Sequence, residues 1–164
     1  MSTKPKVYLE TTIPSYFTAW RSRDLVMAAN QETTREWWSR RKNDFEFFVS
    51  LAVIKESGAG DPDAAKRRLE FLTPFPLLDI SDEVESLAAK LIADVPLPPN
   101  AQVDALHIAV AAVNHMNYLV TWNCTHIANA ILRSKIEKVC RSEGYEPPVV
   151  CTPQEMLEKE DQDA

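Results

Sequence analysis

Short apolar runs alternate with longer segments of helical composition along the whole chain. Five of these runs have the length and the β-branched or aromatic residues typical of strands, and they occupy residues 6–9, 45–49, 77–80, 118–121 and 149–151. Strands that alternate with helices predict a mainly parallel sheet with helices on both faces. We therefore expect an α/β fold, a three-layer α/β/α sandwich with a mainly parallel sheet of about five strands.

Helix start and stop signals divide the segments between the predicted strands. Pro14 suits the first turn of a helix, and Ser50, Asp61 and Ser81 stand where helix N-caps are expected. The predicted helices cover residues 14–20, 24–42, 51–56, 62–71, 82–95, 103–116 and 130–143, with a short one from Pro153. The helix over 103–116 is apolar on nearly all sides, which predicts that it is buried between layers.

Composition and charge are those of one ordinary globular domain. The 164 residues include 45% hydrophobic and 26% charged residues, and no apolar run is long enough to span a bilayer. We assign residues 1–155 to a single domain and residues 156–164 to an acidic C-terminal tail. Three widely spaced cysteines without a Cys-x-x-Cys pair, and an N-terminus unlike a signal peptide, predict a cytoplasmic protein with reduced thiols.

Three carboxylates stand where this plan predicts one edge of the sheet. Glu10 follows the first strand, Glu56 lies in the helix after the second, and Asp104 opens the buried helix before the fourth. Parallel sheets keep their sites at the carboxyl edge, and carboxylate oxygens suit Mg²⁺ or Mn²⁺. Taken singly, Asp104 equally fits a first-turn acid that favours the helix dipole, and the two glutamates fit solvated surface acids.

A polar cluster directly after the fourth strand is predicted at the same edge. It contains Asn123, Thr125, His126 and Asn129. His126 is the histidine best placed for a site role, because lone histidines elsewhere on helices more often make structural hydrogen bonds. The net charge of −6 argues against a protein that grips nucleic acid by overall positive charge, but it leaves a nuclease with a local acidic metal site open.

Other readings of the sequence are weaker. Trp37 and Trp38, with the basic run at 40–42, could contact nucleic acid, although a helix with a buried aromatic face explains them better. With three glycines the chain has no P-loop or dinucleotide-binding loop, and it has no Gly-x-Ser-x-Gly elbow. A phosphotransferase or hydrolase with an acidic nucleophile after the first strand would need Asp-x-Asp, which the segment Glu10-Thr11-Thr12 does not supply.

Four segments in order carry a resemblance that covers nearly the whole chain. They are YLETTI at 8–13, FVSLAVIKE at 48–56, DALHIA at 104–109 and LVTWN at 119–123. In this order and strand context they resemble the acidic motifs of PIN-domain proteins, of the kind found as the ribonuclease toxin in bacterial VapBC-type toxin–antitoxin pairs. Two positions depart from that family, because Glu10 stands where Asp is usual and Asn123 stands at its last acidic position. The site would thus have three carboxylates and an amide oxygen.

The resemblance implies a Mg²⁺- or Mn²⁺-dependent endoribonuclease that hydrolyses RNA phosphodiesters, is neutralised by a cognate antitoxin protein, and forms a homodimer. Glu10 and Asp104 would bind the metal directly, and Glu56 directly or through water. Asn123 and His126 would orient the water or the phosphate, and Thr12 would orient Glu10 or a metal-bound water through its hydroxyl. Arg21 and Arg23 are candidate phosphate contacts, with solvated surface arginines as the simpler alternative. Trp20, Trp37 and Trp38 are candidates for an interface.

The alternative function is a PIN-like module that binds RNA or a protein partner without cutting. It rests on Asn123, because an amide in place of a carboxylate removes one negative charge from the expected metal site. Metal binding and RNA cleavage with and without a chelator distinguish the two.

Overall fold

The protein is described by a computed structural model over residues 3–98 and 100–157. In that part of the chain five strands form one sheet in the order β3-β2-β1-β4-β5, and every neighbouring pair is parallel. The strands are β1 (Lys6–Leu9), β2 (Glu46–Ser50), β3 (Leu77–Leu78), β4 (Tyr118–Val120) and β5 (Val149–Cys151). The predicted parallel sheet is confirmed, although β3 is two residues shorter than expected.

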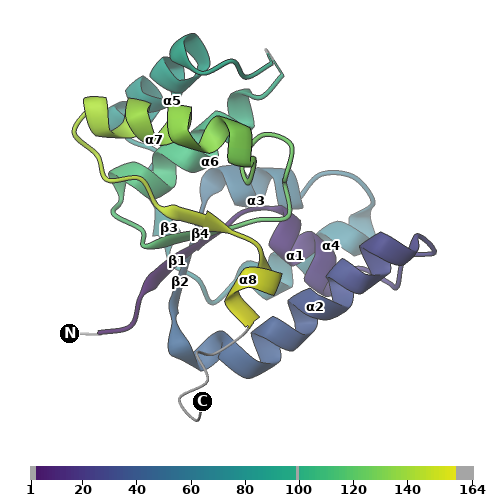
Figure 1. The fold of residues 1–164 in the computed structure, drawn as a ribbon. Helices are drawn as coiled ribbons and strands as arrows, with labels where there is room; N and C mark the ends of the chain where they lie inside the picture. The colour runs from purple at the N-terminus through teal and green to yellow at the C-terminus, as the bar shows by residue number, and fades with distance from the viewer. Residues whose placement is uncertain (1–2, 99, 158–164) are drawn as a thin grey trace, which may run out of the picture.

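Helices cover both faces of the sheet (Figure 1). Helices α5, α6 and α7 lie over one face, and α1, α2, α4 and α8 over the other, with α3 between the two groups. The bounds are α1 (Thr12–Thr18), α2 (Leu25–Arg41), α3 (Leu51–Ser57), α4 (Pro62–Leu72), α5 (Asp82–Asp94), α6 (Gln102–Val113), α7 (Ala130–Ser142) and α8 (Pro153–Leu157), and a short 3-10 turn, η1 (Lys42–Asp44), follows α2. The fold is therefore the predicted three-layer α/β/α sandwich.

Two of the three predicted serine and aspartate caps form, and the third does not. The side chains of Asp61 and Ser81 accept the backbone N–H groups of Ala64 and Val84 at the starts of α4 and α5. Ser50 precedes α3 as expected, but its side chain makes no cap hydrogen bond. Its hydroxyl is bonded instead to a buried tyrosine of β1, so tertiary contact overrides the local capping preference.

The core contains an aromatic cluster on the α2 side of the sheet. Trp37 is fully buried, and Trp38 packs against Phe47, Phe71 and Phe75. The interpretation of this helix as one with a buried aromatic face is confirmed, and the use of Trp37 in nucleic-acid or protein contact is wrong, since its side chain has no exposed surface. Trp20 differs from both, because it is 79% exposed.

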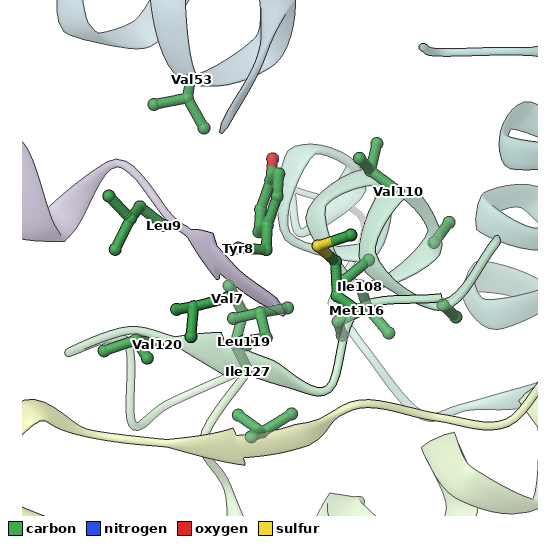
Figure 2. Packing of buried hydrophobic residues seen from close by; sticks show 14 of the residues in the cluster. Val7, Tyr8, Leu9, Val53, Ile108, Val110, Met116, Leu119, Val120 and Ile127 are labelled. Carbon is green, nitrogen blue, oxygen red and sulfur yellow. The ribbon is translucent and has the colours of Figure 1, made fainter. Parts of the chain in front are cut away.

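Side chains of β1 alternate between the two faces, as a strand requires. Figure 2 shows Tyr8 pointing away from β1 toward Val53 of α3 and Val110 of α6, with its hydroxyl oxygen at the far end of the ring. Tyr8 is completely buried although it ends in a polar atom. A buried phenol needs a hydrogen-bond partner, and this strand position therefore brings a polar group into the core beside the carboxyl edge of the sheet.

The C-terminal end of the described chain packs against the domain. Met156 in α8 is buried in the core, and Arg41 of α2 donates to its carbonyl oxygen at 2.9 Å. The rest of the predicted acidic tail, residues 158–164, lies outside the described residues. In the described ranges no helix combines the length and the apolar character needed to cross a membrane.

Candidate functional site at the carboxyl edge of the sheet

The strand order reverses between β1 and β4, and the candidate site lies at the ends of these two strands. Consecutive strands run outward from β1 through β2 to β3, whereas β4 and β5 lie on the other side of β1. Two hydrogen bonds join the segments that follow β1 and β4. The Glu10 N–H donates to the Val120 carbonyl at 3.2 Å, and the Trp122 N–H donates to Thr12 Oγ1 at 2.8 Å. This is the switch point at which open α/β sheets bind ligands.

Glu10 is a buried carboxylate directly after β1. It is 4% exposed, and both of its oxygens accept from the backbone N–H of Thr12, at 2.8 and 3.2 Å. Burial raises the pKa of Glu10 above its ordinary value, more than nearby His107 and the Thr12 hydrogen bond lower it. The Thr12 backbone and its side chain both stabilise this carboxylate, and the Thr12 hydroxyl also accepts from the Trp122 N–H.

Glu56 is bound by a chain of polar side chains that begins in the core. Tyr8 Oη lies 2.8 Å from Ser50 Oγ and 2.7 Å from His107 Nδ1, and His107 Nε2 lies 2.7 Å from Glu56 Oε1. Thr11 Oγ1 donates to the same Glu56 oxygen at 2.6 Å. These contacts join β1, β2, α3 and α6 at one point.

The electrostatics of this chain favour an ionised Glu56. Partial burial raises the pKa of Glu56, but the hydrogen bonds from His107 and Thr11 and the nearby imidazole outweigh it and hold the pKa below its ordinary value. Burial raises the pKa of Tyr8 well above its usual range, so the phenol keeps its proton. The charges of Glu10 and Glu56 also raise the pKa of Tyr8, which places both carboxylates near it.

Asp104 forms a second carboxylate–histidine pair, in the first turn of α6. Its Oδ2 lies 2.6 Å from His126 Nδ1, and its Oδ1 accepts from Asn123 Nδ2 at 3.0 Å. Asn123 Oδ1 in turn accepts the backbone N–H groups of Thr125 and His126. The amide of Asn123 therefore fixes the loop after β4 and connects it to Asp104.

The structure brings predicted site residues together in two groups near the ends of β1 and β4. Asp104, Asn123 and His126 are in direct contact, and Glu10 and Glu56 are close enough that the charge of Glu56 raises the pKa of Glu10. Arg21 and Arg23 are exposed beyond the far end of α1, which starts at Thr12 beside the site.

Sequence reasoning missed the residues behind Glu56. Tyr8, Ser50 and His107 are all buried, and His107 was expected only as a structural hydrogen-bonder. One signal was available, because Asp104 and His107 are three residues apart and so lie on one face of a helix. The partners that each would find could not be read from that spacing.

The carboxylate oxygens of the site are the ligands that a hard divalent cation requires, but they do not form a complete coordination shell. Across residues 3–98 and 100–157, no three side chains from His, Cys, Asp and Glu are grouped closely enough to hold a metal ion. Mg²⁺ usually keeps several waters and takes only one or two carboxylates from the protein. Glu10 fits this need, because it is a buried carboxylate whose hydrogen bonds come from the neutral groups of Thr12.

These features define the class of the protein as an α/β/α sandwich with an acidic edge at its switch point. No family model and no curated protein matches the sequence. Among solved structures, VapBC2 from Rickettsia felis bound to a DNA fragment from their promoter is similar to this chain, with a TM-score of 0.57 and 14% sequence identity. The match covers 90% of this chain and 98% of that one. This likeness shows a shared fold over nearly the whole domain, as the resemblance to PIN-domain proteins implied.

Proposed function

We propose that the chain is a Mg²⁺- or Mn²⁺-dependent endoribonuclease that hydrolyses RNA phosphodiesters. What supports the proposal is an acidic edge in two parts: Glu56 lies near enough to Glu10 to raise its pKa, and Asp104 is hydrogen-bonded to Asn123 just beyond β4. The charge of Glu56 disfavours the ionised form of Glu10, and a bound cation would relieve that repulsion. The choice of RNA as substrate rests on the resemblance to PIN-domain toxins.

Each residue has a role in this proposal. Glu10 and Asp104 would hold the cation, with Glu56 as a direct or water-mediated ligand. The cation, when bound, supplies charge neutralisation at the phosphate and Lewis acidity. Asn123 fixes Asp104 by its hydrogen bond. His126 uses Nδ1 for Asp104, which leaves its Nε2 side for a phosphate or a water molecule.

Partner and substrate surfaces belong to the same proposal. We assign Arg21 and Arg23 to contacts with RNA phosphates outside the cutting site, since both are exposed at the end of α1. The chain is proposed as the toxin of a type II toxin–antitoxin pair, with an antitoxin protein as partner and a homodimer as its assembly. Exposed Trp20, Leu25 and Val26 give an apolar surface that suits protein contact. Light scattering at high micromolar concentration tests the dimer, and co-purification with the product of the neighbouring gene tests the antitoxin.

The test of the nuclease is RNA cleavage by the purified chain with EDTA and after Mg²⁺ or Mn²⁺ is added back. We expect cleavage only with metal, and at least about 100-fold slower cleavage by Asp104→Asn, equivalent to about 2.7 kcal/mol of barrier. Asp63→Asn is the matched control, because Asp63 is also a first-turn acid, in α4, but its side chain is exposed. Equal cleavage by the parent and Asp104→Asn would refute the proposal.

One observation favours a second candidate, the module that binds RNA or protein without cutting. Both oxygens of Asp104 are already bonded, to Asn123 and His126, and the described residues form no group of three metal ligands. In that case the parent would bind single-stranded RNA equally well in EDTA and in Mg²⁺ and would leave it intact. Binding by fluorescence anisotropy under both conditions, beside the cleavage assay, distinguishes the two.

A further inference from the structure

The hydrogen-bonded row of side chains behind Glu56 places polar groups in the core. Burying polar groups costs free energy, and the need to fill space does not explain why polar side chains stand there. Tyr8, Ser50 and His107 are at most 1% exposed, beside a core made mainly of aliphatic and aromatic side chains. Phe, Ala and Leu would fill such positions without polar atoms that need partners. The chain has one outlet, because it ends on the Glu56 carboxylate, whose side chain is 39% exposed at the site edge.

Hydrogen-bond chemistry gives the chain a direction. An ionised carboxylate only accepts, so His107 must donate from Nε2 to Glu56. A neutral imidazole that donates from Nε2 accepts at Nδ1, where the Tyr8 hydroxyl donates. The Ser50 hydroxyl can then donate to Tyr8, so that Ser50, Tyr8 and His107 each have a hydrogen-bond partner.

The same contacts fix which part of Glu56 faces the site. His107 and Thr11 both bind Oε1, at 2.7 and 2.6 Å, and neither binds Oε2. One oxygen is therefore fixed from the core side and the other is left for a ligand in the site. His107 itself is too deeply buried to touch a substrate.

We propose that His107 is a positioning residue that, supported by Tyr8 and Ser50, holds Glu56 with one oxygen bonded and the other presented to the site. The assignment rests on the proposed nuclease function, which it deepens. Residues that orient metal-site carboxylates commonly change activity by about 10- to 100-fold when they are replaced.

Two isosteric substitutions separate positioning from packing. The side-chain amide nitrogen of Gln reaches the place of the imidazole Nε2, whereas that of Asn reaches only the place of Nδ1. We expect His107→Gln to keep kcat for RNA cleavage within about 5-fold of the parent and His107→Asn to lower it about 10- to 100-fold, with KM within about 3-fold for both. His115→Gln and His115→Asn are the controls, because His115 is exposed at the opposite end of α6.

Tyr8→Phe removes only the hydroxyl, and it tests the positioning role if His107→Asn does not fold. It should lower kcat by up to about 10-fold with little change in KM. Equal losses for His107→Gln and His107→Asn in folded proteins, or losses confined to KM, would overturn the proposal.

Nitrogen NMR of the metal-free, RNA-free full chain gives a readout that does not depend on activity. We expect His107 to be protonated at Nε2 and unprotonated at Nδ1. A proton on Nδ1 with a bare Nε2 would overturn the positioning role whatever the cleavage assay shows. A parent protein that cuts no RNA with any divalent metal would instead refute the nuclease, while the tautomer still decides whether His107 donates to Glu56.

Discussion

The two carboxylate–histidine pairs of the site have similar hydrogen-bond lengths, but different parts of the structure hold them in place. Glu56–His107 and Asp104–His126 are joined at 2.7 and 2.6 Å. Helix α6 contributes the histidine of one pair and the carboxylate of the other, one helical turn apart. His107 is anchored through Tyr8 and Ser50 in the core, whereas His126 and Asp104, each with a 21% exposed side chain, depend on a loop fixed by Asn123.

This difference indicates that the two pairs have different roles at the edge of the sheet. The Glu56–His107 pair is held by elements of the sheet and by buried groups, so its geometry should change little when a ligand binds. In the Asp104–His126 pair the histidine lies in a loop and both side chains are partly solvated, so a bound cation or phosphate can replace a hydrogen bond at low cost. We therefore expect the first pair to provide rigidity and the second to respond to the ligand.

The largest stability contrast is expected between the two histidines. His107→Ala would leave a cavity and would strip partners from Tyr8 in the core, at a cost of about 3 kcal/mol of unfolding free energy. His126→Ala would remove a partly exposed pair, at a cost of about 1 kcal/mol or less. Urea denaturation of the metal-free proteins measures both, and equal costs would contradict the comparison.

Asn123 tests the loop-based pair. Asn123→Asp places a second carboxylate 3.0 Å from Asp104 in place of an amide donor. Repulsion should lower the stability of the metal-free protein by about 1–2 kcal/mol, and the added charge should tighten Mg²⁺ binding by a similar amount. Asn129→Asp is the control, since Asn129 caps α7 through an oxygen that Asp also provides. If neither quantity changes in Asn123→Asp, Asn123 lies outside the metal shell.

Replacing the charged Glu10 by a neutral residue should raise the stability of the metal-free protein, whereas neutralising a paired charge usually lowers it. Because its pKa is raised by burial, the ionised form destabilises the metal-free fold above that pKa. Glu10→Gln should therefore raise stability near neutral pH by about 0.5–2 kcal/mol while it abolishes cleavage. The advantage should fade as the pH falls through the raised pKa of Glu10, and it should be gone below the unfolded pKa of about 4.3, where the parent carboxyl is protonated in both states. Melting temperatures of the two proteins across this range check the sign.

The smallest expected effect is at Glu56. Its lowered pKa means that the ionised group stabilises the fold above the unfolded pKa of about 4.3, and that this stabilisation is lost as the pH falls through the folded pKa. Solvent screens a side chain that is 39% exposed, so Glu56→Gln should cost only a few tenths of a kcal/mol to about 1 kcal/mol at neutral pH. A gain in stability, as at Glu10, would mean that the His107 contact does not hold Glu56 ionised.

The sequence predicted the layers and the strands because apolar periodicity is a local property. Asp104, Asn123 and His126 could be placed together because they border one strand and the helix before it. The chain from Ser50 through Tyr8 to His107 joins residues up to 99 positions apart, so no local pattern announces it. Ser50 illustrates the limit, since it has the identity and place of a helix cap and uses its hydroxyl in the core.

The most direct test is calorimetric titration of Mg²⁺ and Mn²⁺ into the parent, Asp104→Asn and Asp63→Asn proteins without RNA. If the acidic edge holds a divalent cation, the parent and Asp63→Asn should bind it alike, and Asp104→Asn should bind at least about tenfold more weakly, a loss of about 1.4 kcal/mol or more. Equal binding by all three folded proteins, or no binding by the parent, would contradict a cation site built on Glu10 and Asp104.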